Sequence, residues 1–289
     1  MKTKVAIIDM QPIDPPVGGG RLRLLGLYHG LGENIEAKYI GTYDWPGEKY
    51  RQHNLTPTLE EIDIPLSNAH HVAAKQLAKE AGGKTVIDLA FSRLCHLSPE
   101  YLIKAVEAVN WADVVIFSHP WVFPLLENHL KPTQLIVYDS HNVEGFLRAQ
   151  LLDKNNPVER ELLREVVDAE YRVGQRAQLI LACSQEDIDL FSRIYEWPVT
   201  KMQVVPNGVM ASKITVATHE EKLAAKQSVG LSPNRMATIF IGSDYHPNVE
   251  AATFIIEELS DKHPDIDFVI AGGVGACMLG QLPKNVVIT

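Results

Sequence analysis

The sequence predicts a doubly wound α/β protein, in which helices cover a parallel sheet. Short, continuous apolar runs recur along the chain, and such runs are typical of strands that are buried on both faces of a parallel sheet. Segments with helix-start signals lie between the runs, so strand and helix alternate. Polar, titratable and glycine residues follow the runs, at the sheet edge where open α/β sheets bind ligands.

The apolar runs give the expected strands. Eight of them are clear: residues 4–9, 113–117, 135–138, 179–182, 202–205, 237–241, 268–271 and 286–288. Residues 37–41 and 85–89 are weaker candidates. With these two, residues 1–209 would form one sheet of about seven strands.

The helices are predicted from start signals and from one long charged segment. Three start signals stand out: Ser98-Pro99, Ser184-Gln185-Glu186-Asp187 and Thr218-His219-Glu220-Glu221. The first places proline at the first helical position, and the other two resemble capping boxes. Residues 157–176 are predicted as one helix. Residues 67–81 are interpreted as a polar helix, on which His70 and His71 should face solvent.

A domain boundary is expected after the strand at 202–205. The 289 residues suggest about two domains, and a new strand series begins at residue 237. We therefore predict an N-terminal Rossmann-like domain at 1–209, and a linker with the first part of a second, incomplete Rossmann-like domain at 210–289. Because the chain stops within a predicted strand, we expect a truncated protein whose uncovered apolar faces favour self-association.

Composition excludes several classes of protein. Hydrophobic residues make up 46% and charged residues 22%, so a fully disordered chain is excluded. The net charge of −9 argues against a general nucleic-acid-binding role. Three widely spaced cysteines form no disulfide framework or metal motif. With no apolar run of about 20 residues and no signal peptide, we expect a soluble, cytoplasmic protein.

Three glycines, Gly18-Gly19-Gly20, lie between the first strand and a helix that starts near Arg21. Glycines let the backbone approach a ligand, and a helix N-terminus offers free N–H groups to an anion. A loop that merely needs positive φ would explain the same residues. The segment is not a Walker A loop, and Arg23 stands at the third glycine position of a dinucleotide fingerprint.

Two histidines, His119 and His141, come shortly after strands that end at the same sheet edge. A histidine there could donate a hydrogen bond to a sugar hydroxyl or phosphate, or transfer a proton near neutral pH. The alternative is that each caps a loop or packs on Trp121 or Asn142. Neither an H-E-x-x-H pair nor a G-x-S-x-G elbow occurs in the sequence.

Taken in order, the strand-end motifs resemble the retaining GT-B glycosyltransferases of family 4, the glycosyl transferases group 1. The motifs are Pro15-Pro16-Val17-Gly18-Gly19-Gly20-Arg21-Leu22-Arg23, Ser118-His119-Pro120, residues 138–144, residues 182–187, Val204-Val205-Pro206-Asn207-Gly208-Val209 and residues 240–251. The last two, on either side of the domain change, are together fairly specific. The resemblance covers nearly the whole chain.

The resemblance implies a hexosyltransferase-type enzyme that moves a sugar from a nucleotide-sugar donor to an acceptor hydroxyl, with retention of anomeric configuration. It implies no metal, and no cofactor besides the donor, which is a substrate. The acceptor would be a carbohydrate or a lipid-linked sugar, and the latter would bring peripheral membrane contact. The implied site residues are His119 as the catalytic residue, Gly19, Gly20, Asn207, Gly242 and Ser243 for the donor, and Arg21 and His141 for the acceptor.

Two departures from the family pattern predict weak donor binding. The chain stops at Thr289, before the region in which the family carries its E-x7-E glutamate pair, and Asp244-Tyr245-His246 stands where a basic pair is expected. Each charge-assisted bond lost to a phosphate is worth about 1.5–3 kcal/mol, so this chain should be weak or inactive.

Two alternatives to a glycosyltransferase stay open, because one fold hosts many chemistries. One is a nucleotide-dependent isomerase or dehydrogenase on a Rossmann fold, against which the missing third glycine and the weak context of Asp44 count. The other is a non-catalytic, degenerate binding module.

Overall fold

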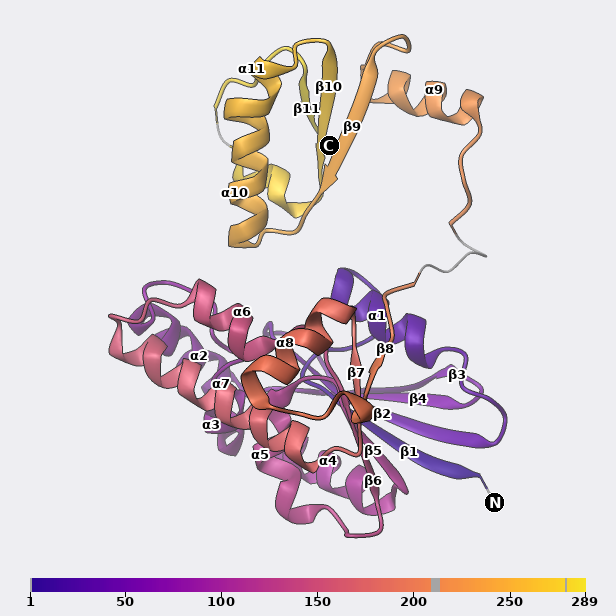
Figure 1. Cartoon of the computed structure of the whole chain (residues 1–289), viewed down its shortest axis with the longest axis vertical. Coiled ribbons are helices and arrows are strands. Elements are labelled where there is room, and N and C mark those ends of the chain that lie inside the picture. Colours follow the sequence, from indigo (N-terminus) through magenta and orange to yellow (C-terminus); the bar gives the residue numbers. More distant parts are fainter. Residues whose placement is uncertain (1, 209–213, 279) are drawn as a thin grey trace. The chain divides into compact units, whose positions relative to one another are not determined.

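The structure is a computed structural model that describes residues 2–208, 214–278 and 280–289. Its internal contacts divide the chain into two compact units, Met1–Val209 and Met210–Thr289 (Figure 1). The boundary predicted between residues 209 and 210 lies outside the described residues, as does Val209 of the motif before it.

The first unit is built on an eight-stranded sheet with the order β3-β4-β2-β1-β5-β6-β7-β8. Every neighbouring pair is parallel except β3 and β4. The strands are β1 (Thr3–Ile8), β2 (Ile35–Tyr43), β3 (Arg51–Thr56), β4 (Leu59–Pro65), β5 (Val114–Phe117), β6 (Leu135–Asp139), β7 (Leu179–Ala182) and β8 (Met202–Val204). The parallel strands end at one edge of the sheet.

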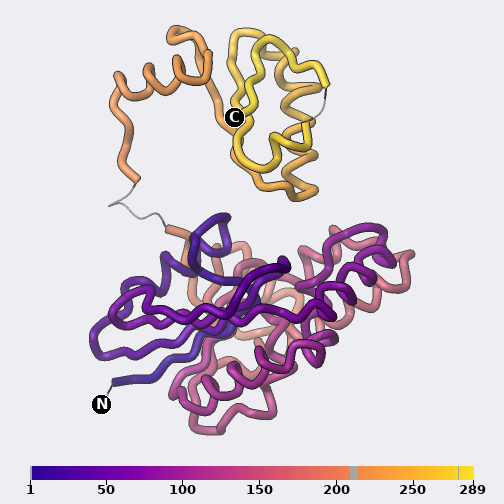
Figure 2. Tube along the Cα trace, turned by 180° about the vertical axis from the view of Figure 1, so that it is seen from behind, coloured from indigo at the N-terminus to yellow at the C-terminus, as the bar shows by residue number. Residues whose placement is uncertain are grey.

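Helices connect the parallel strands and supply part of the core. They are α1 (Gly19–Tyr28), α2 (Asn68–Glu80), α3 (Phe91–Leu94), α4 (Pro99–Trp111), α5 (Phe123–Leu126), α6 (Glu144–Leu151), α7 (Pro157–Arg176) and α8 (Gln185–Tyr195). Apolar residues of α2, α3, α4, α5, α7 and α8 form one cluster with alternate residues of the strands, Ala6 and Ile8 of β1 among them. Figure 2 shows this unit from behind.

The helix starts follow the sequence signals, with one difference. Ser184 forms a capping box with Asp187, as predicted, and the 157–176 helix has its predicted bounds. Pro99 opens α4, but Ser98 makes no side-chain cap. Its hydroxyl instead accepts from the Ser67 backbone N–H at 3.0 Å and contacts His70, so it joins α2 to α4.

Two expectations about local structure are wrong, and one hairpin was not predicted. Residues 85–89 form no strand; residues 87–90 form a turn, in which the Asp88 side chain accepts from the Leu89 N–H at 2.9 Å. The sequence did not predict the β3–β4 hairpin, because β3 is a polar edge strand and β4 carries the buried acids Glu61 and Asp63. His70 is fully buried instead of solvent-facing, and burial lowers its pKa to about 4.

The second unit has a three-stranded parallel sheet with the order β11-β10-β9. Its elements are α9 (His219–Ser228), β9 (Met236–Ile241), α10 (His246–Phe254), the π-helical segment Ile255–Leu259, α11 (Ser260–Lys262), β10 (Ile266–Ala271) and β11 (Val286–Ile288). Thr218 and Glu221 form the predicted capping box of α9. The small core contains Ala252, Phe268, Ile270, Val274 and Val286.

No helix in the described part of the chain is both long enough and apolar enough to cross a membrane.

Candidate functional site

The candidate site of the first unit lies where β1, β5 and β6 end. These strands are adjacent and parallel, so the residues that follow them meet at one edge. Asp9 directly follows β1, His119 comes two residues after β5, and His141 comes two residues after β6. The sequence therefore brings one carboxylate and two imidazoles together from positions up to 132 residues apart.

His119 is held by an ion pair and by ring contacts. Its Nδ1 lies 2.8 Å from Asp9 Oδ1, and the two side chains are 13% and 0% exposed. Its ring stacks on Trp121 with centroids 5.6 Å apart and planes at 15°. The His141 ring lies at 4.2 Å, tilted by 44°. The predicted histidines are thus side by side, and packing on Trp121 accompanies the ion pair.

The charges of these groups are set by one another. Burial opposes the charged form of His119, but the Asp9 carboxylate raises the pKa of His119 above its ordinary value. Burial likewise opposes ionisation of Asp9, yet His119 lowers the pKa of that carboxyl. Burial, followed by the positive charge of His119, holds the pKa of His141 well below 6.5. The pKa values of the two neighbouring imidazoles are therefore shifted in opposite directions.

Asp9 is fixed by contacts on both of its oxygens. Oδ1 accepts the Met10 N–H at 2.7 Å in addition to His119. Oδ2 accepts from Gln11 Nε2 at 3.2 Å and from the Tyr39 hydroxyl at 3.3 Å. These bonds orient the carboxylate toward His119 and leave it little freedom to rotate.

A second buried ion pair lies at the same edge. Arg23 of α1 contacts Asp139 at the end of β6 at 2.7 Å, and the two side chains are 1% and 0% exposed. Tyr28 donates to the other Asp139 oxygen at 2.8 Å. Arg23 also donates to the Val205 carbonyl at 2.7 Å and to Asn207 Oδ1 at 3.0 Å. The Asn207 side chain is therefore engaged by Arg23.

The glycine segment begins α1 without a side-chain cap. Gly18 has φ +88°, a conformation that favours glycine, and no acidic residue occupies the first turn. A Cβ at Gly19 would meet open space, whereas one at Gly20 would lie 3.0 Å from Gln11 Nε2. The free N–H groups of this helix start are thus open to an anion, and Gln11 links the loop to Asp9.

Arg21 lies away from the histidines. Its guanidinium sits 4.7 Å from the centre of the Trp45 ring and donates to the Pro15 carbonyl at 3.3 Å. It borders a separate pocket beside the glycine segment.

Gly242 and Ser243 belong to the second unit and follow β9. Gly272 follows the neighbouring strand β10 with φ +90°, and a Cβ there would lie 2.5 Å from the Gly242 carbonyl. Asn248 of α10 donates to the Ser243 carbonyl at 3.1 Å. Close approach of two glycine turns and a helix start makes this a second candidate anion site.

Sequence reasoning missed Asp9 and did not select Asp139 and Arg23. The sequence pattern places Asp9 at the end of the first predicted strand and Arg23 at the third glycine position of a dinucleotide fingerprint, and neither placement indicates a partner. A carboxylate that ends an apolar run at the ligand-binding edge was the available signal. In the part of the chain that the structure describes, no group of three His, Cys, Asp or Glu side chains is placed to hold a metal ion.

Comparison with known proteins gives the fold. No protein-family model matches the sequence, and no curated protein matches it significantly. Among solved structures, sucrose-phosphate synthase from Thermosynechococcus elongatus aligns with a TM-score of 0.66 at 11% identity, over 94% of this chain and 62% of that one. Anabaena HepE in complex with UDP and glucose aligns with a TM-score of 0.58 at 12% identity, over 99% and 68%.

The catalytic domain of Arabidopsis thaliana starch synthase IV, bound to ADP and acarbose, also aligns, with a TM-score of 0.54 at 12% identity, over 94% and 69%. The chain thus has the GT-B fold that the motifs predicted, and it spans about 62% of the length of the first of these proteins.

Two sequence features count against a dinucleotide-binding protein, and the first of them, the weak context of Asp44, does not hold in the structure. Asp44 directly follows β2, the strand that pairs with β1, so an acidic residue does end the second strand of the β1-α1-β2 unit. The second feature, the missing third glycine, has a physical basis in the structure. Arg23, at the third glycine position, fills the interior between α1 and the sheet with a buried, ion-paired side chain.

Proposed function

We propose that this chain belongs to a nucleotide-sugar-dependent glycosyltransferase of the hexosyltransferase type, which transfers a sugar to an acceptor hydroxyl with retention of anomeric configuration. The observation that carries the proposal is the Asp9–His119–His141 cluster beside the open start of α1, at the ligand-binding edge of a GT-B fold. The donor's diphosphate would be received by uncapped N–H groups, and the reacting sugar by the imidazoles.

Each group in the cluster suits one part of the reaction. The bond from the anomeric carbon to the diphosphate breaks, the acceptor oxygen bonds to that carbon, and the acceptor proton passes to the diphosphate. His119, whose charged form Asp9 favours, would donate a hydrogen bond to a donor-sugar hydroxyl or to the departing phosphate. Neutral His141 beside it would accept a hydrogen bond from a hydroxyl. The N–H groups at Gly19 and Gly20 would stabilise the leaving charge.

The proposal is tested first by binding. UDP, ADP and NAD are titrated into the whole chain by calorimetry, with UDP or ADP expected to bind and NAD expected not to. UDP release from UDP-glucose in the presence of saccharides then measures turnover. Because the sequence predicts weak donor binding, turnover of this chain should be low, and His119→Ala should lower it further, by up to about 10²–10⁴-fold; the exposed His129→Ala serves as the control. Wild-type turnover in the His119 variant would make it a loop residue only.

Asp44 favours a second candidate, a nucleotide-dependent dehydrogenase or isomerase. Its carboxylate ends β2, at the position from which an acidic residue binds the ribose of NAD in a Rossmann unit. NAD binding that is lost in Asp44→Ala, together with no binding of UDP or ADP, would support this candidate over the first.

We also propose weak self-association through β9 of the second unit. This strand is at the edge of its sheet, and Ile239 and Ile241 are 63% and 71% exposed. Exposed apolar edge strands favour pairing with another copy. Sedimentation at tens of micromolar should show concentration-dependent dimers that Ile239→Lys abolishes, and a monomer at all concentrations would overturn the proposal.

A further inference from the structure

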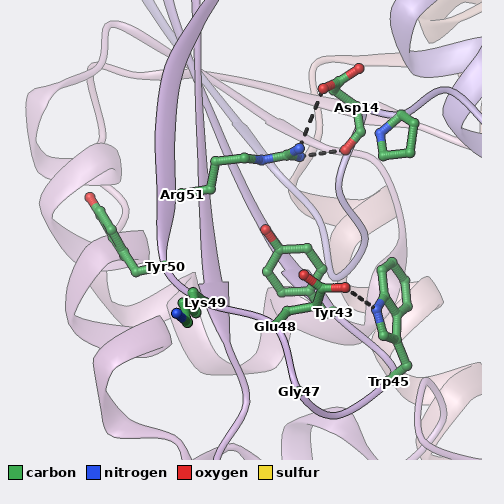
Figure 3. Close-up of a pocket in the computed structure, with 9 residues that line it drawn as sticks. Asp14, Tyr43, Trp45, Gly47, Glu48, Lys49, Tyr50 and Arg51 are labelled. Carbon is green, nitrogen blue, oxygen red and sulfur yellow. Dashed lines mark hydrogen bonds and ion pairs between the residues drawn. The ribbon is translucent and has the colours of Figure 1, made fainter.

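A pocket outside the histidine site lies at the end of β2. Its volume is about 480 Å³, and its lining includes Asp14, Tyr43, Trp45, Glu48 and Arg51 (Figure 3). Pockets of this size are typical of small-molecule sites, which combine aromatic walls with a few convergent polar groups. Tyr43 and Trp45 supply the aromatic wall, in an edge-to-face contact with centroids 5.2 Å apart.

The pocket shares structure with the glycine segment. Asp14 and Pro15 lie in the connection from β1 to α1, a few residues before Gly18. Arg21, in the first turn of α1, lies over the Trp45 ring at 4.7 Å and donates to the Pro15 carbonyl. In register, Ile40 of β2 and Phe117 of β5 are both level with Ile8 of β1, so β2 runs three residues beyond the end of β5, and the ends of the two strands are about 14 Å apart. A ligand bound here would reach His119 only if it extends across that distance.

The charges of the pocket do not suit an anion. Arg51 is already paired with Asp63 at 2.7 Å, with Asp14 at 3.3 Å and with Glu61 at 3.5 Å, and it also donates to the Asp14 carbonyl. Glu61 and Asp63 are fully buried behind it. The Arg51 guanidinium is thus already engaged by three carboxyl groups and is not free to bind a phosphate.

The remaining polar groups suit hydroxyls. Glu48 accepts from the Trp45 indole N–H at 2.7 Å and keeps a second carboxylate oxygen. The Tyr43 hydroxyl, for which no hydrogen bond is formed within the described ranges, lines the same pocket. Lys49 adds a donor at the rim. Carboxylate acceptors, a phenol and an aromatic wall match a neutral compound that carries hydroxyls on a partly apolar ring.

We propose that this pocket, defined by Tyr43, Trp45, Glu48 and Arg51, binds the neutral saccharide acceptor, with Trp45 packing on the sugar ring and Glu48 accepting from its hydroxyls. The inference rests on the proposed glycosyltransferase function and selects an uncharged sugar over a sugar phosphate. It also assigns the β2–β3 connection as the segment that determines acceptor specificity.

The test measures sugar binding apart from nucleotide binding. Saturation-transfer NMR is recorded on the whole chain with glucose, galactose, mannose and maltotriose, and with the 6-phosphates of the three hexoses. We expect transfer to at least one neutral sugar and at least tenfold weaker binding in Trp45→Ala. Trp111→Ala is the matched control, because Trp111 packs with Lys4 and Lys38 at the amino ends of β1 and β2, and it should leave binding unchanged.

The outcomes separate this inference from the proposed function. Transfer to the 6-phosphates alone, transfer to none of the sugars, or transfer that survives Trp45→Ala would overturn the pocket assignment. Neutral-sugar binding without UDP or ADP binding would support the pocket and count against the glycosyltransferase. If Trp45→Ala lowers the melting temperature, the exposed Glu48→Ala variant replaces it, with the same expected loss.

Discussion

Replacing Asp9 with asparagine should destabilise the first unit in a way that depends on pH. The substitution keeps the size of the side chain and an acceptor oxygen for the His119 Nδ1–H and the Met10 N–H. The new amide would face Gln11 and Tyr39. The Gln11 amide can flip to accept, and the Tyr39 hydroxyl already donates to the Gln11 carbonyl at 2.6 Å. The main loss is therefore the negative charge opposite His119.

The size of the effect follows from the hydrogen bond that changes. A charge-assisted bond contributes about 1.5–3 kcal/mol and a neutral one about 0.5–1.5 kcal/mol. The difference, about 1–2 kcal/mol, is the expected loss in the free energy of unfolding. Solvent screening should reduce this energy only slightly, because the Asp9 and His119 side chains are 0% and 13% exposed.

The sign of the pH dependence comes from both partners. Asp9, whose pKa is lowered, contributes stability above its ordinary value of 3.8 and loses it as the pH falls through the lowered value. His119, whose pKa is raised, contributes stability below 6.5 and loses it as the pH rises through the raised value. The pair therefore contributes most between about pH 4 and 6.5. At pH 9 we expect a smaller loss, since the contribution of the pair falls as the pH rises through the raised pKa of His119.

Urea unfolding at pH 5.5 and pH 9, followed by tryptophan fluorescence, measures this difference. All four tryptophans, residues 45, 111, 121 and 197, belong to the first unit, so the signal reports on that unit alone. A loss that is equal at both pH values, or larger at pH 9, would refute the ion-pair argument and leave only a geometric role for Asp9.

Two further stability predictions use the same fluorescence assay. Glu170 accepts four hydrogen bonds, two on each oxygen, at 2.7–2.9 Å. In Glu170→Gln at pH 8, the new NH2 group would face two of these donors, so the free energy of unfolding should fall by about 2–4 kcal/mol. A loss below 1 kcal/mol would contradict this. A Cβ on Gly174 would lie 2.0 Å from the Trp197 ring, so Gly174→Ala should cost about 3 kcal/mol. The control Gly26→Ala, in open space on α1, should stabilise by about 0.4–1 kcal/mol, and equal effects at both glycines would contradict the packing argument.

The sequence predicted those parts of the fold in which local pattern and burial agree. The central strands are continuous apolar runs because helices cover both of their faces, and such runs are visible without the structure. The β3–β4 hairpin has no such pattern, since its buried residues include Glu61 and Asp63, and acidic residues in a sequence normally indicate a solvent-exposed position. These acids are buried because Arg51 pairs with both of them, because burial and the neighbouring Glu61 raise the pKa of Asp63 to about 7, and because Glu61 accepts the Ile13 N–H at 2.5 Å.

The residues at 85–89 show the opposite error. Val86 and Leu89 are almost completely buried, as a strand would require, but they lie at a turn that leads into α3. Burial alone does not distinguish a strand from a packed turn, because the choice depends on whether a neighbouring strand is free to pair. Here β4 already has β2 on one side and β3 on the other, so no pairing edge is left between them.

In the candidate site, too, the sequence predicted some features and not others. The strand-end rule found His119 and His141 because a parallel sheet places consecutive strand ends together, whatever the side chains are. It could not find which groups pair, because that depends on side-chain reach across the edge. The structure supplies this step: Asp9 reaches His119 across one strand spacing, and Arg23 reaches Asp139 from the helix above.

The two ion pairs together explain why so much charge is buried at this edge. A buried pair usually adds little net stability, because desolvation offsets the attraction. Here, however, Asp9 and Asp139 fix groups that come from different parts of the chain. Asp9 orients His119, and Asp139 fixes Arg23, which also holds the Val205 carbonyl and Asn207. Since α1 begins at the open glycine segment, anchoring Arg23 within α1 also anchors the uncapped N–H groups. Charge that costs free energy in a core thus gives fixed positions at the edge where a ligand would bind.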